Sequence, residues 1–418
     1  MENVNSESLV LKQKLKPMNK AMLGAHTLNN TVSIFISTFL ISYIYSISSN
    51  YVMNIALFYA FNYFSMMVFY LLISKIIDKT DRVSFYRIAI VIRAVFIICV
   101  VLWGASLAKY VVLAGLLHGF SESCYWCSYN LMKNELVSKH AVAKYSGYQL
   151  VACEITNIVV PIVLGRIIDS AAFADCAKII LGVAVLELIL SIFIKSKRPE
   201  NSSFNIKGFF SDIKNKGQAG RLVVLSILIG GFYGLTSVIA PLKTIIIMYE
   251  YGSDFSLGII TSIVAVVTLV TITLMRKFTK IGNRKVIFIV SGVLPIISTL
   301  LLVIHVCKTT IIIYSFITAV CTVAHSMSFD IIRNIILKKL DLYDDIAEYQ
   351  CSIECVMELE RVVAFSLMAM AGAIGAYFGS VFIALKIFMM FSIFSILLVN
   401  IFLIVLEKRM KACGLTED

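Results

Sequence analysis

Apolar runs long enough to cross a lipid bilayer follow one another through almost the whole chain. A transmembrane helix needs roughly 20 consecutive apolar residues. The runs are continuous rather than alternating, which indicates helices and excludes the strands of a membrane β-barrel. Hydrophobic residues make up 59% of the sequence, against about half in a soluble domain. We therefore predict an all-α polytopic membrane protein of twelve spans, covering about 22–46, 52–76, 85–107, 110–132, 148–168 and 177–194, with six more beginning near 222, 256, 286, 309, 351 and 381.

The formal net charge of +12 is unevenly placed along the chain. Lys and Arg gather at both termini and in alternate loops, whereas the other loops have only Lys109, Lys178 and Lys308 near the span ends. The positive-inside rule then puts both termini and the long connector after span 6 in the cytoplasm. Because the basic residues form no single face, we expect no nucleic-acid partner. The predicted location is the cytoplasmic membrane.

The cysteines and the N-terminus give no sign of a cofactor or a cleaved leader. The ten cysteines lie mostly inside apolar runs, as Cys99, Cys124, Cys127 and Cys153 do, and are typical of small core residues. They form neither a disulfide framework nor a metal-binding pair. The first twenty residues are polar and basic, so we expect no cleavable signal peptide. No cofactor and no metal site are predicted.

The second half of the chain repeats the first at an offset of 204 positions (358 − 154). Between the two copies lies a basic stretch with the Asn, Ser and Gly content of a linker. The repeat predicts two six-helix halves, 1–194 and 222–418, joined by a cytoplasmic connector over 195–221. The matched pairs are Ala143 with Ala347, Tyr145 with Tyr349, Glu154 with Glu358 and, just upstream, Asn130 with Asn334.

Two loops in equivalent places of the halves carry related charged patterns. The loop between spans 2 and 3 holds Ser74, Asp78, Lys79, Asp81 and Arg82, and the loop between spans 8 and 9 holds Lys280, Gly282 and Arg284. The signature Gly-x-x-x-Asp-(Arg/Lys)-x-Gly-(Arg/Lys) of the major facilitator superfamily matches the first with both glycines replaced. The second keeps the glycine and the basic end but lacks the acid. With twelve spans in two halves, the chain resembles this family over nearly its whole length.

The resemblance implies a fold of two pseudo-symmetric halves in which spans 1, 4, 7 and 10 line a central cavity. It also implies secondary transport by alternating access, with the charged loop latching the cytoplasmic side in the outward-open state. In that interpretation Asp78, Lys79 and Arg82, with Lys280, Gly282 and Arg284 in the second copy, are gating residues. The alternative is that they are ordinary positive-inside charges.

Span 4 is unusually polar and aromatic for a membrane helix. Glu122 lies near mid-span, where a charge is a candidate functional group because of its cost in lipid. Tyr125 and Trp126 could stack on a substrate or hydrogen-bond to it. Asn30 of span 1 and Asn130 are further candidates for the substrate or proton pathway. The alternative is hydrogen bonding between helices that stabilises the bundle.

Spans 10 and 11 carry two close acid–base pairs at similar predicted depth. Asp330 and Arg333 are spaced i, i+3, and so are Glu358 and Arg361, so each pair shares a helix face. We predict one intramembrane network of these four residues, with Asn334 beside it. The network is either a site that couples ion movement to substrate or a structural cluster.

Glu154 differs from its repeat mate Glu358 because its own helix offers no nearby cation. Arg93 on span 3 is a conceivable partner. An unpaired buried acid is the better proton carrier, since burial favours its protonated form. Glu154 is therefore the stronger candidate for carrying a proton.

These features favour a secondary active transporter that moves a small solute by alternating access, coupled to a proton gradient. A proton-driven efflux pump for multiple drugs or amphipathic compounds is the alternative, and a non-transporting receptor or scaffold is a third. An enzyme is not expected, since His-Glu-x-x-His, Gly-x-Ser-x-Gly and Gly-x-x-x-x-Gly-Lys-(Ser/Thr) are absent from the sequence. The expected partners are a small-molecule substrate, protons and the lipid bilayer, and we expect a functional monomer.

Overall fold

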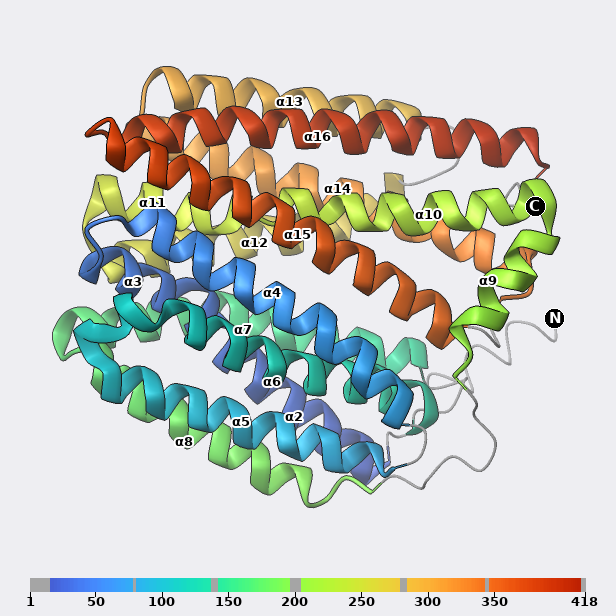
Figure 1. The fold of residues 1–418 in the computed structure, drawn as a ribbon, viewed down its shortest axis with the longest axis horizontal. Helices are drawn as coiled ribbons and strands as arrows, with labels where there is room; N and C mark the ends of the chain where they lie inside the picture. The colour runs from blue at the N-terminus through green and yellow to red at the C-terminus, as the bar shows by residue number, and fades with distance from the viewer. Residues whose placement is uncertain are drawn as a thin grey trace.

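A computed structural model describes residues 16–77, 80–136, 142–195, 204–278, 284–342 and 346–414, and these ranges contain helices but no strand. The helices run lengthwise through one bundle (Figure 1). The first half contains α2 (Pro17–Ile34), continued by a π-helical turn, η1 (Phe35–Leu40), and by α3 (Ile41–Ile47), then α4 (Tyr51–Ile76), α5 (Arg82–Trp103), α6 (Leu107–Leu136), α7 (Val142–Ser170) and α8 (Phe173–Ser191). The second half contains α10 (Gly217–Thr236) with α11 (Ile239–Tyr251), α12 (Asp254–Phe278), α13 (Arg284–Ile304), α14 (Lys308–Lys339), α15 (Ile346–Tyr377) and α16 (Val381–Ala412).

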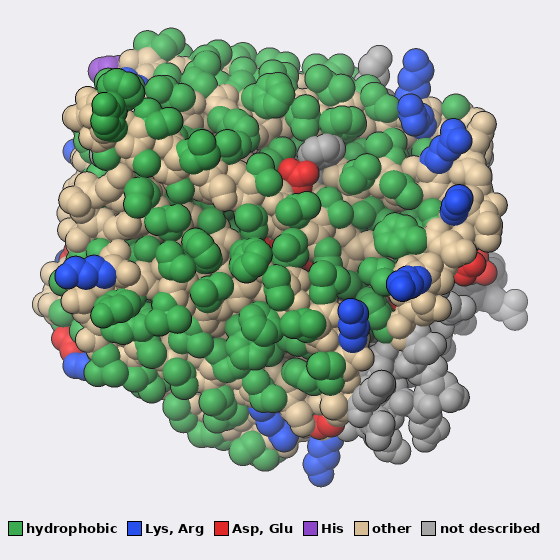
Figure 2. Space-filling view, viewed as in Figure 1, with side chains coloured by type: hydrophobic (Ala, Val, Ile, Leu, Met, Phe, Trp, Pro, Cys, Tyr) green, Lys and Arg blue, Asp and Glu red, His purple; other side chains and the backbone are tan. Residues whose placement is uncertain are grey.

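Ten stretches of the described chain are long and apolar enough to cross a membrane. One of them, 82–133, contains both α5 and α6, which a short turn at Gly104–Ser106 joins. The remaining long helix, α8, carries three charged residues, Asp175, Lys178 and Glu187. Hydrophobic side chains cover the face of the bundle seen in Figure 2, and Lys and Arg side chains lie toward its ends. The prediction of an all-α polytopic membrane protein is confirmed.

The connector between the halves contains a short helix where the sequence predicted a linker. This helix, α9 (Ile206–Asn215), packs Phe209 and Ile213 into the core of the second half and exposes Lys207 and Lys214. Its N-terminus is capped by Asn205, whose side chain accepts a hydrogen bond from the Gly208 amide. Phe209 and Ile213 are spaced i, i+4 and share one face of the helix, whereas the basic residues lie on the exposed side. This amphipathic pattern explains why α9 lies along the end of the bundle (Figure 1).

The helices of the two halves correspond under the offset of the sequence repeat. Shifting α4 by 204 positions (51 + 204 and 76 + 204) gives 255–280, against 254–278 for α12. The same shift takes α7 to 346–374, against 346–377 for α15. These four helices also join the halves, since α4 packs on α15 and α7 packs on α12. Each contact therefore pairs the second helix of one half with the fifth helix of the other.

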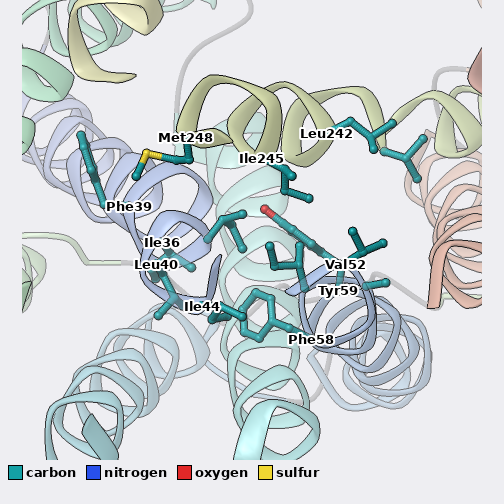
Figure 3. Close-up of a cluster of buried hydrophobic side chains, with 14 of the residues drawn as sticks. Ile36, Phe39, Leu40, Ile44, Val52, Phe58, Tyr59, Leu242, Ile245 and Met248 are labelled. Carbon is teal, nitrogen blue, oxygen red and sulfur yellow. The ribbon is translucent and has the colours of Figure 1, made fainter. Parts of the chain in front are cut away.

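The buried apolar side chains form one shared cluster at one end of the bundle and two separate clusters at the other. We call the end where α3 meets α4 and α11 meets α12 the outer end, and the opposite end, where α2 begins and α16 ends, the inner end (Figure 1). At the outer end, Ile36 and Phe39 of the first half and Ile245 and Met248 of the second belong to one cluster (Figure 3). At the inner end, the cluster around Tyr125 is built mainly from the first half, with Cys351 of α15 added, and the cluster around Phe329 contains no residue of the first six-helix half. The outer end is thus sealed by apolar contacts between the halves.

Glycine permits the close approach of α7 and α12, which gives a first prediction. A methyl group added at Gly258 would lie 2.2 Å from the carbonyl oxygen of Pro161, so the helices would have to move apart. We expect Gly258→Ala to lower the thermal stability of the purified protein by about 1–3 kcal/mol, the usual cost of overpacking. Gly182→Ala on α8 is the control, since nothing lies within 4 Å of the added group. Equal melting temperatures for the two variants would contradict the prediction.

Candidate functional site

Arg93 is the centre of a buried polar cluster in the first half. It lies on α5 and its side chain is completely buried. The guanidinium is 3.1 Å from Oε1 of Glu122 on α6 and 3.5 Å from Oε2 of Glu187 on α8. It also donates a hydrogen bond to the side-chain oxygen of Asn29 on α2. One arginine therefore joins four helices of the first half.

Neutral donors surround the two carboxylates of this cluster. The Tyr86 hydroxyl donates to Glu187 at 3.1 Å, and the Trp126 indole N–H donates to Glu122 at 2.8 Å. A ring nitrogen of His118 lies 3.7 Å from Glu122. Two carboxylates thus share one guanidinium, so the cluster keeps an excess negative charge unless it binds a proton or another cation. Isolated charge of this kind is costly in a low-dielectric interior.

Beside this cluster, hydrogen bonds link Tyr125 of α6 through His26 of α2 to Gln149 of α7. The ring of Tyr125 lies under the Arg93 guanidinium, at 4.9 Å, and its hydroxyl is 2.6 Å from Nδ1 of His26. The other ring nitrogen of His26 is 2.9 Å from the side-chain nitrogen of Gln149, whose oxygen accepts a hydrogen bond from Lys133 at 3.0 Å. Groups of this chemistry can donate and accept protons in turn. Tyr125 therefore contacts the cluster directly, and its ring is fully buried.

Glu154 lies on α7 close to the contact between α7 and α2. Asn30 of α2 donates hydrogen bonds to Thr156 at 2.5 Å and to Asn157 at 3.0 Å. Glu154 itself is buried, with 7% of its surface exposed, and its Oε2 has no hydrogen-bond partner. The Asn157 side chain hydrogen-bonds to Glu154, and no ion pair to this carboxylate occurs among the described residues. Asn130, a further candidate from the sequence, lies beside Tyr70 of α4.

The acid–base pairs of the second half form within single helices. Glu358 is completely buried and binds Arg361 at 2.6 Å, both on α15. The Arg361 guanidinium also lies 4.8 Å from the ring of Tyr63 on α4, so this pair meets the first half. Glu354, one turn earlier, accepts a hydrogen bond from Gln350 at 2.9 Å. Two carboxylates and one arginine thus occur here as well.

The predicted network of Asp330, Arg333, Glu358 and Arg361 is divided in the structure. Asp330 and Arg333 are 3.1 Å apart on α14, and no ion pair joins them to the α15 pair among the described residues. The side chain of Asp330 is 53% exposed within the bundle, and Asn334 is exposed one turn later. Lipid contact at such a position would be costly. This face of α14 therefore suits contact with water or protein rather than with lipid.

Two further expectations are corrected or left untested by the geometry. Arg93 does not pair with Glu154, because the carboxylates of Glu122 and Glu187 occupy it. Sequence reasoning missed Glu187, although an acid inside the apolar stretch that follows Lys178 was a usable signal. Of the loop residues, Arg82 is buried at the start of α5 and Arg284 begins α13. Asp78, Lys79, Lys280 and Gly282 lie outside the described residues.

Comparison with known proteins identifies the family. The sequence profile of the Major Facilitator Superfamily matches residues 21–343. The chain belongs to the major facilitator superfamily. The twelve helices in two related halves are the fold of this family, so the fold implied by the degenerate loop signatures is confirmed. The family consists of membrane transporters.

Relatives in sequence are distant. "Uncharacterized protein YqgE" of Bacillus subtilis (strain 168) is 21% identical over 311 residues, which are 72% of this chain and 71% of the relative. "Uncharacterized protein in sodM 3'region" of Geobacillus stearothermophilus is 25% identical over 101 residues, 24% of this chain and 47% of the relative. Neither name assigns a substrate.

Several solved transporters have a similar fold. A bacterial homologue of the iron transporter ferroportin, in an inward-facing state, superposes with a TM-score of 0.68 at 12% identity, covering 94% of this chain and 100% of that one. The nucleoside transporter NupG gives 0.67 at 12% identity, covering 93% and 98%. A transporter of the POT family in complex with 5-aminolevulinic acid gives 0.70 at 12% identity, covering 94% and 96%. At these identities the likeness concerns the fold alone.

The buried cluster predicts that Arg93 stabilises the first half. Arg93→Met leaves Glu122 and Glu187 without their shared cation, and removing one partner of a buried ion pair costs about 3–5 kcal/mol. We expect a correspondingly large fall in the denaturant midpoint of the purified protein. Lys178→Met is the control, since it breaks the exposed pair with Asp175 and should cost at most about 1 kcal/mol. Similar midpoints for both variants would refute the structural role of Arg93.

Proposed function

We propose that the protein is a secondary active transporter that moves a small solute across the cytoplasmic membrane by alternating access, coupled to a proton gradient. Membership of the family supports a transporter. The observation that carries the coupling is the excess of buried carboxylates over buried cations. Glu122 and Glu187 share Arg93, Glu354 and Glu358 lie around Arg361, and Glu154 adds a carboxylate with an unpartnered oxygen.

Protons are the simplest cations to balance this excess. In a low-dielectric interior a carboxylate without a cation is more stable when protonated. Glu154 can take up and release a proton without breaking an ion pair, whereas Glu358 must do so against Arg361. Glu154 is therefore the proposed proton carrier, and Glu358 the second. The buried acids lie on α6, α7, α8 and α15, so a change in how the helices pack changes their surroundings.

Efflux of amphipathic compounds is the second candidate function. Trp126 beside Glu122 and Tyr63 beside Arg361 place aromatic rings next to charged groups. A ring compound with a positive charge fits such an environment, because aromatic faces and carboxylates both attract cations. Proton-driven import moves the solute and the proton in the same direction, whereas proton-driven efflux moves them in opposite directions. The direction of solute-driven proton movement therefore distinguishes the two.

The proton-coupling proposal predicts that Glu154 and Glu358 are needed for solute-driven proton movement. Protein in liposomes with a trapped pH dye is tested against sugars, nucleosides, amino acids and amphipathic amines. We expect wild-type protein to move protons with at least one of these solutes. The Glu154→Gln and Glu358→Gln variants should do so at no more than about a tenth of the wild-type rate. Glu360→Gln, on the same helix as Glu358 but partly exposed, should behave as wild type. Wild-type rates in both site variants would exclude these residues as proton carriers.

The proposed topology can be tested with native cysteines. Cys413 is exposed at the inner end, and Cys307 is partly exposed at the outer end, before α14. With the inner end in the cytoplasm, a membrane-impermeant maleimide should label Cys413 in inverted vesicles and not in intact cells. Cys307 should show the opposite preference, and Cys413→Ser and Cys307→Ser variants assign each signal. Labelling of Cys413 from outside intact cells would reverse the topology.

A further inference from the structure

The first turn of α12 is held by a carboxylate from the other half of the protein. Asp169, near the C-terminal end of α7, accepts hydrogen bonds from the Asp254 amide at 3.1 Å and the Phe255 amide at 3.2 Å. Its second oxygen also accepts one from the Ser253 hydroxyl at 2.7 Å. Amides at the start of a helix have no partner within the helix, and a carboxylate there also interacts favourably with the helix dipole. Asp169 of the first half thus caps a helix of the second half.

Further contacts join the same turn of α12 to the first half. Ser42 on α3 donates a hydrogen bond to the Asp254 carboxylate at 2.5 Å. The Arg166 guanidinium lies 5.4 Å from the ring of Phe255. A methyl group added at Gly165 would lie 2.4 Å from the Asp254 carbonyl oxygen, so the backbones are close here. All these contacts lie at the outer end.

The repeat places a weaker version of this contact on the other side of the bundle. Asn50 caps α4 by accepting a hydrogen bond from the Met53 amide, as Ser253 caps α12 through the Ser256 amide. The Asn50 side chain also donates to the carbonyl oxygen of Gly372 on α15, at 3.1 Å. The second helix of each half is therefore tied at its start to the fifth helix of the other. One tie has three hydrogen bonds to a carboxylate, and the other has one neutral hydrogen bond.

We propose that Asp169 is the latch residue of the outer gate: its cap on α12 holds the outer ends of the two halves together, and the outer end opens when this cap is released. The inference rests on the proposed alternating-access function and adds to it a specific gating residue. Three observations carry it. Both oxygens of Asp169 are used across the boundary between the halves, the donors are in the other half, and Leu164 and Leu257 beside the contact belong to the apolar cluster that seals the same end.

The Asp169 cap can be released without unfolding α12. When the halves separate, water can replace the carboxylate on the amides of Asp254 and Phe255, because the turn lies at the end of the bundle. Ser253 still caps the Ser256 amide after release, so α12 keeps one cap within its own half. The contact therefore contributes to closure more than to the folding of α12. A neutral side chain at 169 should weaken the closed state and leave the helix intact.

The test measures the separation of the outer ends in the full-length protein. A ketone-bearing amino acid at Ala105, between α5 and α6, and another at Thr309, at the start of α14, are both exposed sites at the outer end, one in each half. Spin labels attached to them report the distance by double electron–electron resonance in lipid nanodiscs, with no solute added. We expect Asp169→Asn to increase the ratio of long to short distances about tenfold, the change that follows from losing one charge-assisted hydrogen bond.

Matched variants separate gating from folding. Asp175→Asn removes an exposed acid at the same end whose partner, Lys178, lies on its own helix, and should leave the distances as in wild type. Asn50→Ala should change the ratio less than Asp169→Asn, since it removes one neutral bond between the halves. Ser253→Ala should act in the same direction as Asp169→Asn. Asp169→Asn with wild-type distances and a wild-type melting temperature would overturn the proposal.

Failure of the proposed function would appear in a different measurement. It would show as absence of solute-driven proton movement in wild-type liposomes, which the distance measurement does not use. A shift of the distance ratio in Asp169→Asn supports the latch whatever solute the protein carries. An unchanged ratio in a folded variant overturns the latch, even where proton movement is intact.

Discussion

A charge inside a bilayer must be neutralised by a partner or kept in contact with water, and most polar contacts of this protein follow from that constraint. Arg93 is completely buried and is surrounded by Glu122, Glu187 and the side chain of Asn29. Glu358 is equally buried and binds Arg361. The Arg93 cluster connects four helices, α2, α5, α6 and α8. The ionic clusters therefore stabilise each half and at the same time place titratable groups within it.

The two ionic clusters meet near the boundary between the halves. Arg361 of α15 lies against the ring of Tyr63 on α4, and Glu122 is near enough to Glu358 for their charges to interact. A proton on one carboxylate changes the energy of the other, and the distance between them depends on how the halves pack. Under the proposed function, this dependence is the physical link between proton binding and movement of the halves. It needs no contact with the solute to operate.

Local spacing and composition were sufficient to predict much of the fold and part of the site. The pairing of Glu358 with Arg361 follows from i, i+3 spacing on one helix, and twelve helices follow from the apolar runs. The ion pair between Arg93 and Glu187 could not be predicted in this way. The two residues are 94 positions apart (187 − 93), and the spacing of residues on different helices does not show whether their side chains face each other. Neither residue has a charged mate in the repeat, because positions 297 and 391 are Ile297 and Phe391. The repeat therefore gives no indication that Arg93 pairs with Glu187.

The contacts between the halves are symmetric in shape and asymmetric in chemistry. Gly165 and Gly372 both lie at close approaches between a fifth helix and the second helix of the other half. At equivalent sites, however, Glu154 has an unpaired oxygen whereas Glu358 has Arg361, and Asp169 contributes a charge where the Asn50 contact is neutral. Under the proposed function, the symmetric frame lets the halves rock with little change in packing. A net cycle driven by a gradient also needs groups whose proton affinity and contact strength differ between the two sides, and in that proposal the contrast between Glu154 and Glu358 and the contrast between the Asp169 and Asn50 contacts supply these differences.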